Sequence, residues 1–171
     1  QRQMSKINNL NATLELDKKI INQNIMIIRG SKKGLILDVS DLYCEVFGYE
    51  KSFLIGKKIT SFQIAIMSYS VYKDVIKTLL NKKIWSGEIE NKMSNDQHKW
   101  TQARIIPILD ESGELIEFNA VFHDITNKKL LEELYITDPL TKLYNRRYFD
   151  EIMSLITKHQ RKSEINFTLV A

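Results

Sequence analysis

The sequence predicts an α+β domain: a five-stranded antiparallel sheet with helices on one face, flanked by a helix at each end. Two observations predict this class. Stretches with the two-residue alternation of half-buried strands cluster at both ends of residues 24–126, and stretches with helical periodicity lie between them. Short turn sequences join the last three strands, which suits antiparallel pairing. Strands grouped in this way favour the α+β class over repeated strand–helix–strand units.

Residues 1–23 read as a helix that precedes the domain. Its main apolar positions form a short heptad seam, interrupted at Asp17: Ile7, Leu10, Leu14 and Ile21. The helix is otherwise polar, so alone it would be marginally stable. Two interpretations are open: a dimerising linker, or a helix that packs on its own domain.

Two strands and several helices come next. Apolar stretches at 25–28 and 35–39 flank a turn and predict a strand pair. Ser40 is placed to cap a short helix, and Gly48 is placed to end it in a left-handed conformation. A longer amphipathic helix is expected over residues 69–81.

Three more strands complete the predicted sheet. The first alternates between apolar and polar residues from Trp85 to Met93, and the second runs from about Lys99 to Leu109. Pro107, near the end of the second, lacks an N–H and suits an edge or a bulge. The third alternates over residues 116–123.

Composition limits the classes of function. The chain has 171 residues, a net charge of +4 and basic residues in scattered pairs, so no nucleic-acid surface is expected. The single cysteine, Cys44, excludes an intrachain disulfide and fits a cytoplasmic compartment. No apolar run is long enough to span a membrane. The chain does not begin with Met, so we expect a piece of a longer protein, in which an upstream membrane anchor is an open alternative.

Several short motifs, in the order of the predicted elements, resemble the PAS family. Residues 41–49 (DLYCEVFGY) and 54–57 (LIGK) resemble its "aF…GY…eliGk" signature. Residues 85–88 (WSGE) resemble the start of its third strand, and residues 124–126 (DIT) match the coupling motif that often closes these domains. The resemblance implies the PAS fold and a sensory or dimerising role.

A second resemblance covers residues 137–149 (TDPLTKLYNRRYF), which are similar to the opening "tDpLTgLxNRR" of GGDEF domains. Lys142 departs from that pattern, since a glycine is usual there. In the family the opening is structural, and that role is carried over to Asp138, Asn145, Arg146 and Arg147. An apolar stripe over 149–156 and an alternating stretch at 165–169 fit the helix and strand that follow.

The two resemblances together imply a domain order. We expect a linker or coiled-coil helix, a PAS sensor domain, a signalling helix and the truncated start of a GGDEF domain, at residues 1–23, 24–126, 127–137 and 138–171. The catalytic motifs of the GGDEF family do not occur, so no catalytic residue is assigned. GTP and Mg are expected only for the complete parent. The apolar stripe would lack its partners, so we expect the segment after Leu143 to be disordered or docked on a non-native surface.

A small-molecule pocket under the sheet is an alternative to a plain core. The candidate wall residues, each equally a core residue, are Ile27, Leu37, Phe47, Ile89, Phe118 and Phe122. No particular cofactor is evident: residues 69–81 contain no histidine for haem, and Cys44 is not in a flavin-adduct context. His98, His123 and His159 have no metal-ligand spacing, so no metal site is expected.

Asp124 and Thr126 are the candidate coupling residues. Thr126 is placed to cap the helix at 127–136, and Asp124 can hydrogen-bond across the junction. The plain alternative is a helix cap worth about 1 kcal/mol. The functional interpretation is a hinge between the last strand and a helix whose Leu130, Leu131 and Leu134 face a partner helix.

These features predict a homodimeric PAS module, responsive to a small-molecule signal, that regulates a diguanylate cyclase in the parent. Cyclases of this family condense two GTP into cyclic di-GMP, one held by each subunit, so a linker that biases pairing is an adequate switch. The alternative is a non-catalytic signalling module in a degenerate GGDEF or cyclic di-GMP phosphodiesterase protein. A PAS domain that feeds a histidine kinase is disfavoured by the stretch at 138–147.

Overall fold

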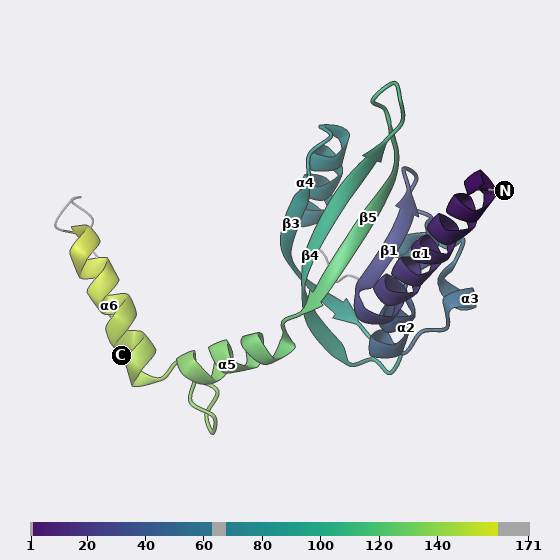
Figure 1. Ribbon diagram of the computed structural model, residues 1–171. Helices are drawn as coiled ribbons and strands as arrows, with labels where there is room; N and C mark the ends of the chain where they lie inside the picture. Colours follow the sequence, from purple (N-terminus) through teal and green to yellow (C-terminus); the bar gives the residue numbers. More distant parts are fainter. Residues whose placement is uncertain (1, 63–67, 161–171) are drawn as a thin grey trace. The chain divides into compact units, whose positions relative to one another are not determined.

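The chain divides into two compact units, Gln1–Thr126 and Asn127–Ala171. The computed structural model describes residues 2–62 and 68–160 (Figure 1). The elements in chain order are α1 (Arg2–Asn24), β1 (Met26–Ser31), β2 (Ile36–Val39), α2 (Asp41–Phe47), α3 (Lys51–Leu54), a 3₁₀ helix (Ile59–Phe62), α4 (Tyr69–Leu80), β3 (Trp85–Lys92), β4 (His98–Leu109), β5 (Leu115–Asp124), α5 (Thr126–Ile136) and α6 (Arg146–Gln160).

The first unit contains the predicted five-stranded antiparallel sheet. Its strand order is β2-β1-β5-β4-β3, so the last strand in sequence lies at the centre (Figure 1). β5 pairs with β1, where Ile28 lies opposite Ala120, and with β4, where Ala103 lies opposite Phe122. The α+β class and the antiparallel sheet are therefore confirmed, and the strand that leads into α5 is held on both sides.

Pro107 lies in β4 beyond the end of β3. The pairing of β3 with β4 stops at Trp85 and Ile105, whereas β4 continues along β5 to Leu109. Pro107 therefore has no β3 partner, and its missing N–H leaves no ladder bond unmade on that side. A register shift follows directly, between Ile108 and Leu109.

One face of the sheet carries the core. Side chains from α2, α3 and α4 pack on the inward positions of the strands, and the largest fully buried ones include Tyr43, Phe47 and Leu54. Val75 and Leu79 are the buried positions of α4, the amphipathic helix expected over residues 69–81. Each such apolar side chain contributes about 1.5–3 kcal/mol when it is buried.

The predicted ends of α2 are confirmed. The Ser40 hydroxyl accepts hydrogen bonds from the backbone N–H groups of Tyr43 at 3.2 Å and Ile27 at 2.9 Å, so it caps α2 and ties it to β1. Gly48 has a φ of 74° and ends the helix in the left-handed conformation. A Cβ at Gly48 would lie 2.3 Å from the Ser94 hydroxyl, which adds a second reason for glycine.

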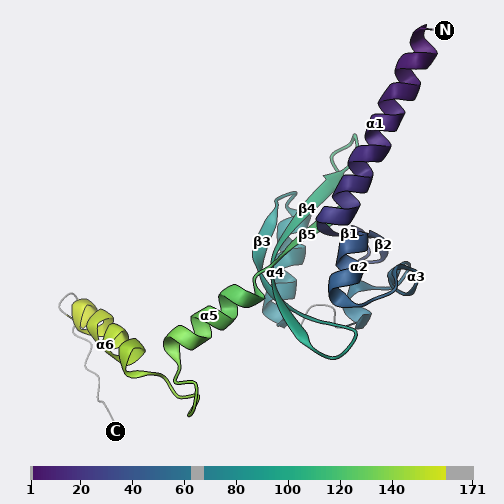
Figure 2. The same cartoon turned by 60° about the horizontal axis from the view of Figure 1, so that its bottom comes forward.

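Helix α1 covers the predicted N-terminal helix and meets the rest of its unit near its C-terminal end (Figure 2). There the Asn22 side chain accepts a hydrogen bond from the Asp41 backbone N–H at 3.1 Å and donates one to the Asp41 carboxylate. The heptad seam remains exposed: Ile7, Leu10, Leu14 and Ile21 keep between 44% and 61% of their surface accessible. Packing on its own domain therefore accounts for only the last turns of α1.

The second unit contains a helix over the predicted apolar stripe. Residues 146–160 form α6, so the first of the two expected alternatives for the segment after Leu143, disorder, is corrected over this range. Local interactions support the helix: the Asn145 side chain accepts from the Tyr148 backbone N–H at 2.9 Å, and Arg147 and Glu151 pair one turn apart at 3.8 Å. The strand predicted at 165–169 lies outside the described residues.

Candidate functional site

A cavity of about 510 Å³ lies between the sheet and α4, within the range of small-molecule sites. Its walls are mostly apolar side chains from α4 and from the inward positions of β3, β4 and β5. They are Val75, Ile76, Leu79, Leu80, Ile89, Ile105, Leu115, Phe118, Ala120 and Phe122.

The structure places the six predicted wall residues at different sites. Ile89, Phe118 and Phe122 line the cavity, whereas Leu37 and Phe47 do not, and Phe47 is fully buried in the core. Ile27 borders a separate groove beside α1, because it alternates with the buried Ile28 and faces the other side of the sheet.

Gly30 allows Phe118 to reach its place in the cavity wall. The two residues are opposite one another on β1 and β5. A Cβ built on Gly30 would lie 2.2 Å from the Phe118 ring, so the ring occupies the space that any larger residue would need. The wall therefore depends on the absence of a side chain on the neighbouring strand.

A polar side chain lies among these apolar walls. Asn91 lines the cavity and is fully buried, yet its Oδ1 atom has no hydrogen-bond partner among the residues that the structure describes. Leaving a buried carbonyl oxygen unpaired costs about 1–3 kcal/mol. Buried polar groups of this kind are normally satisfied by a protein group, an ordered water or an ion.

The orientation of the Asn91 amide is determined by its neighbours. Its Nδ2 donates to the Ile89 carbonyl oxygen at 3.2 Å and to the Thr101 hydroxyl at 2.7 Å. The Thr101 hydroxyl in turn donates to the Ile89 carbonyl at 3.3 Å, so it accepts from Asn91. Turning the amide over would place Oδ1 against a carbonyl oxygen that can only accept, and Oδ1 is therefore the atom without a partner.

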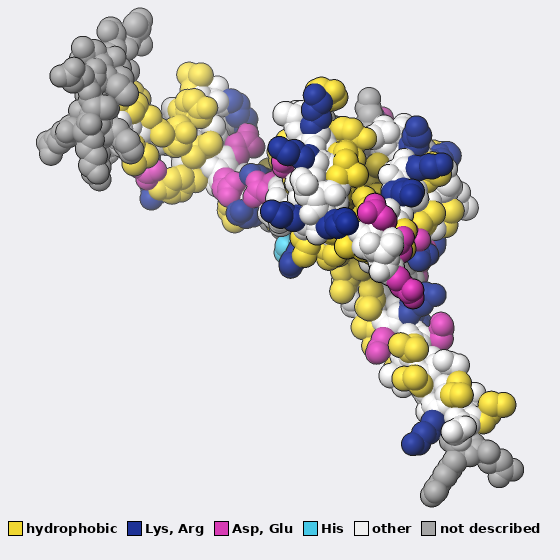
Figure 3. Space-filling model, turned by 90° about the horizontal axis from the view of Figure 1, so that it is seen from above, with side chains coloured by type: hydrophobic (Ala, Val, Ile, Leu, Met, Phe, Trp, Pro, Cys, Tyr) yellow, Lys and Arg dark blue, Asp and Glu magenta, His cyan; other side chains and the backbone are white. Residues whose placement is uncertain are grey.

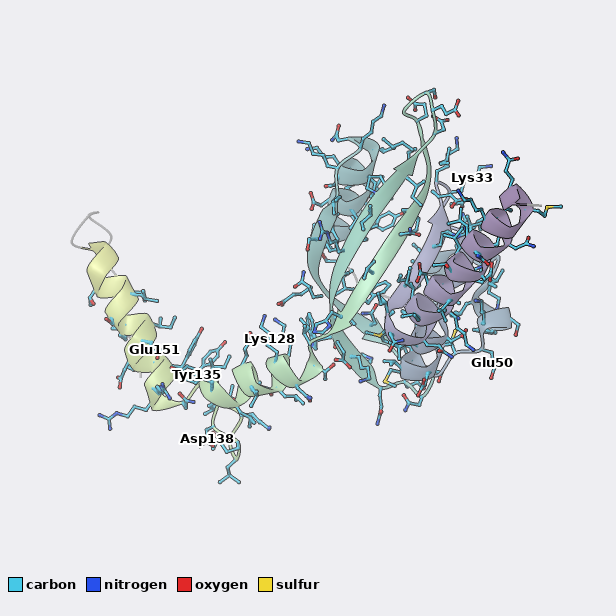
Figure 4. The ribbon with its side chains drawn as sticks, viewed as in Figure 1. Lys33, Glu50, Lys128, Tyr135, Asp138 and Glu151 are labelled. Carbon is cyan, nitrogen blue, oxygen red and sulfur yellow. The ribbon has the colours of Figure 1, made fainter. Side chains whose placement is uncertain are left out.

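Three lysines lie at the solvent side of the cavity. Lys32 and Lys33 belong to the turn between β1 and β2, where Figure 4 labels Lys33, and Lys58 pairs by a β-bridge with Leu35. All three are exposed, and no Asp or Glu is among the described residues that line the cavity. This part of the site therefore favours anions.

Helix α4 is attached to the sheet by a polar contact as well as by the core. The indole N–H of Trp85 donates to the Asp74 carboxylate at 2.9 Å, while its ring lies over Gly87. This contact joins α4 to the edge strand β3, and both elements supply walls of the cavity. Trp85 thus has a structural partner and is not itself a wall residue.

The predicted coupling residues meet at the end of β5. The Asp124 carboxylate accepts from the Lys99 ammonium at 2.7 Å and from the Thr126 backbone N–H at 2.9 Å. The Thr126 hydroxyl accepts from the Trp100 backbone N–H at 3.1 Å. Helix α5 begins at Thr126, and the capping of this helix by the Thr126 side chain stays a prediction. The Asp124 side chain makes the bond to the first turn, and Thr126 ties that turn to β4.

The charge of Asp124 is favoured by these contacts. Partial burial acts to raise the pKa of the carboxyl group, but hydrogen bonds from Lys99 and Thr126 outweigh it and lower the pKa below its ordinary value. The group is therefore ionised at neutral pH and holds one cation and one backbone N–H. The junction joins β4, β5 and α5 through the side chains of Asp124, Lys99 and Thr126.

The second unit has an ordered connection between α5 and α6. The Asp138 carboxylate accepts from the backbone N–H groups of Leu140 at 3.0 Å and Thr141 at 2.8 Å, which closes a turn. These bonds lower the pKa of Asp138. Lys142 follows with a φ of 60°, a left-handed conformation. Figure 4 labels Asp138 on this loop.

Asn145, Arg146 and Arg147 have different surroundings. Asn145 donates to the Tyr135 carbonyl at 2.7 Å, which links the cap of α6 back to α5. Arg147 lies over the Tyr135 ring at 4.1 Å, and the Tyr135 hydroxyl donates to Glu151 at 2.7 Å (Figure 4). Arg146 is exposed and contacts Asp150 on its own helix.

The remaining histidines, the cysteine and possible metal ligands were compared over the part of the chain that the structure describes. Among residues 2–62 and 68–160, no group of three or more His, Cys, Asp or Glu could hold a metal ion. Burial raises the pKa of the Cys44 thiol, which disfavours a reactive thiolate. His98 contacts Glu90 at 3.0 Å. No helix within the described residues is long and apolar enough to cross a membrane.

The sequence analysis did not predict three features of the cavity. These are Asn91, Thr101 and the lysines at its solvent side, Lys32, Lys33 and Lys58, called the mouth lysines below. One signal was present: Asn91 occupies an inward position of the alternation between Trp85 and Met93, where an apolar residue is expected. A polar residue at such a position marks a buried hydrogen-bonding group. The lysines had no comparable signal, because their grouping arises only when separate turns meet.

The fold and the cavity define an α+β domain with a ligand-sized space on the helical face of an antiparallel sheet, whose central strand is hydrogen-bonded to the start of the following helix. A comparison with protein families matches residues 23–127 to the PAS domain. The chain therefore belongs to the PAS domain family, whose members are sensory domains of signal transduction proteins.

Curated relatives agree with this assignment. The chain is 28% identical over 91 residues to the hybrid signal transduction histidine kinase L of Dictyostelium discoideum, covering 53% of this chain and 5% of that protein. It is 26% identical over 113 residues to the aerotaxis receptor of Escherichia coli strain K12, covering 66% of this chain and 21% of that protein. The chain thus spans a small part of each relative.

Solved structures show the same fold. The PAS domain of a Colwellia psychrerythraea protein superimposes with a TM-score of 0.61 at 21% identity, covering 67% of this chain and 98% of that one. An RNA-binding light-oxygen-voltage receptor gives a TM-score of 0.62 at 14% identity, covering 72% of this chain and 38% of that one.

Proposed function

We propose that this PAS domain is the regulatory module of a diguanylate cyclase, and that the Asp124–Thr126 junction transmits its signal. The junction is the observation that carries the proposal. It connects the central strand β5 and its neighbour β4 to the first turn of α5 through Asp124, Lys99 and Thr126. A displacement of the sheet under the cavity would therefore reach α5 directly.

The cyclase assignment is supported by the resemblance of residues 137–149 to the opening of GGDEF domains. Asp138 closes the turn and Asn145 caps α6, which agrees with an ordering role for this stretch. Lys142, where the family usually has glycine, adopts a positive φ of 60°, the conformation for which glycine is suited. The proposed GGDEF portion begins at residue 138, after a signalling helix at 127–137.

The proposal includes a homodimer that works in the cytoplasm. Cyclic di-GMP synthesis from two GTP requires two subunits to face each other, so the signal would act by changing how they pair. GTP and Mg belong to the parent's catalytic domain, and a small molecule in the PAS cavity is the proposed signal. A change of pairing free energy of about 1–3 kcal/mol is enough for a switch.

The test uses the full-length parent and measures cyclic di-GMP formed from GTP. Asp124→Ala and Thr126→Ala should each shift the output by roughly 5- to 150-fold if the junction carries a typical coupling energy. Glu111→Ala, on the turn between β4 and β5, is the matched control, because Glu111 is exposed and remote in sequence from the junction. Unfolding of each variant is followed by circular dichroism.

Unchanged cyclase output in both junction variants, with folded protein, would refute the coupling role. A parent that binds GTP or cyclic di-GMP without making product would favour the second candidate, a non-catalytic or phosphodiesterase protein with a degenerate GGDEF domain. The resemblance at residues 137–149 supports either candidate.

A further inference from the structure

Helix α4 is apolar around more of its circumference than its contact with the sheet requires. Val75 and Leu79 are its buried positions. Next to them around the helix, Tyr72, Ile76 and Leu80 are exposed by 39%, 40% and 65%. These three residues are four apart, so they lie on one line along the helix and are called the apolar ridge below. A helix that is apolar beyond its buried face is expected to have a second partner.

A second ridge runs beside the apolar ridge on the outer side of α4. Tyr69, Lys73 and Lys77 are also four apart, and all three are exposed. The Lys73 ammonium lies 4.5 Å from the centre of the Tyr69 ring. The two ridges, with Asn81 at one end, line an open groove. A groove between two such ridges is where a ridge of another helix packs, whereas a flat surface would leave it unfilled.

The charge around this groove has one sign. Among the described residues, no Asp or Glu lines the groove, and neither Lys73 nor Lys77 forms an ion pair. Asp74, the acidic residue of α4, is hydrogen-bonded to β3. The mouth lysines lie on the other side of the apolar ridge, because they line the cavity together with Tyr72 and Ile76. A partner with negative charge on both sides of an apolar face therefore complements the groove.

A second copy of this chain does not have that complementary charge at the same helix. Pairing α4 with α4 about a two-fold axis would bring Lys73 and Lys77 of both copies into one interface. Like charges that face each other across an interface oppose association. The groove and its charge therefore favour an acidic helix of another protein.

We propose that the outer groove of α4 binds a helix of a partner protein, with apolar residues along one face of that helix and Glu or Asp along both edges of the face. Helix α4 has 12 residues and is about 18 Å long, so a partner helix of about three or four turns would cover it. The proposal goes beyond the sensory function proposed above and does not rest on it. Binding is measured on this chain and needs no cyclase activity.

The test uses a designed acidic peptide and isothermal titration calorimetry. The probe is acetyl-ELEALLAELEALLAELEQ-amide, which as a helix has leucines on one face and glutamates on both edges of that face. In the control peptide, KLKALLAKLKALLAKLKQ, lysine replaces each glutamate. We expect the acidic peptide to bind roughly tenfold more tightly at low salt, and the difference should shrink as salt is added.

Reversing the charge of the lysine ridge should reverse this preference. Lys73→Glu with Lys77→Glu should weaken the acidic peptide roughly tenfold and should bind the basic peptide more tightly than wild type does. Lys6→Glu with Lys19→Glu makes the same change in net charge on the exposed surface of α1. This control variant should keep the preference for the acidic peptide.

The apolar ridge is tested with Leu80→Gln. This variant should weaken the acidic peptide roughly tenfold, because one apolar side chain is no longer buried on binding. Its melting temperature should change little, since Leu80 is exposed in the free chain. Leu16→Gln makes the same substitution at an exposed position of α1 outside the heptad seam, and it should not affect the peptide.

Equal affinity of wild type for the two peptides, or unchanged binding of the acidic peptide to Leu80→Gln, would overturn the proposal. Two other occupants are tested with the same variants. Binding to vesicles of equal parts phosphatidylcholine and phosphatidylglycerol, lost in Leu80→Gln and without peptide binding, would assign the groove to a lipid surface. Self-association that Leu80→Gln abolishes would assign it to a second copy. Either result would replace the partner helix.

Discussion

At the scale of single residues, the Asp124 carboxylate makes two of the hydrogen bonds of the junction. Asp124 holds the Lys99 ammonium and the Thr126 backbone N–H at the point where β5 ends and α5 begins. Asparagine at this position could keep the shape and one acceptor but would lose the charge. The contribution of the charge can therefore be separated from that of the geometry.

The lowered pKa of Asp124 predicts an acid-side loss of stability. Its folded pKa lies below its unfolded value of about 3.9, so the stabilisation is present above that value and is lost as the pH falls through the folded pKa. We expect the free energy of unfolding to fall more for wild type than for Asp124→Asn between about pH 6 and about pH 3, a range that brackets the unfolded pKa. The difference should be below about 1 kcal/mol, because the group is partly exposed.

Urea unfolding at a series of pH values measures this difference. Glu111→Gln on the exposed turn between β4 and β5 is the control and should follow wild type. Parallel pH profiles of wild type and Asp124→Asn would show that the charge of Asp124 adds nothing to the fold.

At the scale of elements, local signals predicted the fold well and the cavity poorly. The alternation from Trp85 to Met93, the cap at Ser40 and the left-handed Gly48 each depend on neighbours in sequence, and each is confirmed. Asn91 and Thr101 meet across two strands, and the mouth lysines come from separate turns. Contacts between residues on different strands or turns depend on the register in which the strands pair. The alternation of apolar and polar residues along one strand does not determine that register.

The same register dependence explains the placement of the predicted wall residues. Ile27 and Ile28 are both apolar, and only the pairing of β1 with β5 decides which of them faces the core. The order of residues 146–160 differs from one of the two expected alternatives, disorder, for another reason. Its Asn145 cap and its i,i+4 ion pairs are local, and the expectation considered only its unpaired apolar stripe.

Gly30 and Phe118 give a prediction about how two strands pack. Gly30→Ala places a methyl group within the Phe118 ring, so the ring must move, at a cost of about 1–3 kcal/mol. Chemical unfolding measures the loss. In a Phe118→Leu background the same substitution should cost less, because the smaller side chain leaves room. Equal costs in both backgrounds would show that the two residues act independently.

At the scale of the whole molecule, apolar surface remains uncovered on the helices that enter and leave the sensory unit. On α5, Leu130, Leu131 and Leu134 are exposed by between 51% and 67%. Figure 3 shows hydrophobic side chains on the surface of α1, where the heptad seam lies. A seam with this spacing is typical of helices that pair with a second copy.

We therefore expect the chain to dimerise through α1, and Leu14 offers a clean test. Leu14 belongs to the seam and is exposed within its own unit, so Leu14→Asp should leave the melting temperature of the monomer unchanged. In a dimer the same aspartate would be buried without a partner, and self-association should weaken at least tenfold. Sedimentation equilibrium measures the association constant.

Lys18→Asp, one turn further along the helix and outside the seam, is the control and should weaken association much less. A monomeric wild type, or a dimer that both variants preserve, would mean that α1 is not the pairing surface, and the pairing expected for signalling would then have to come from the sheet or from α5.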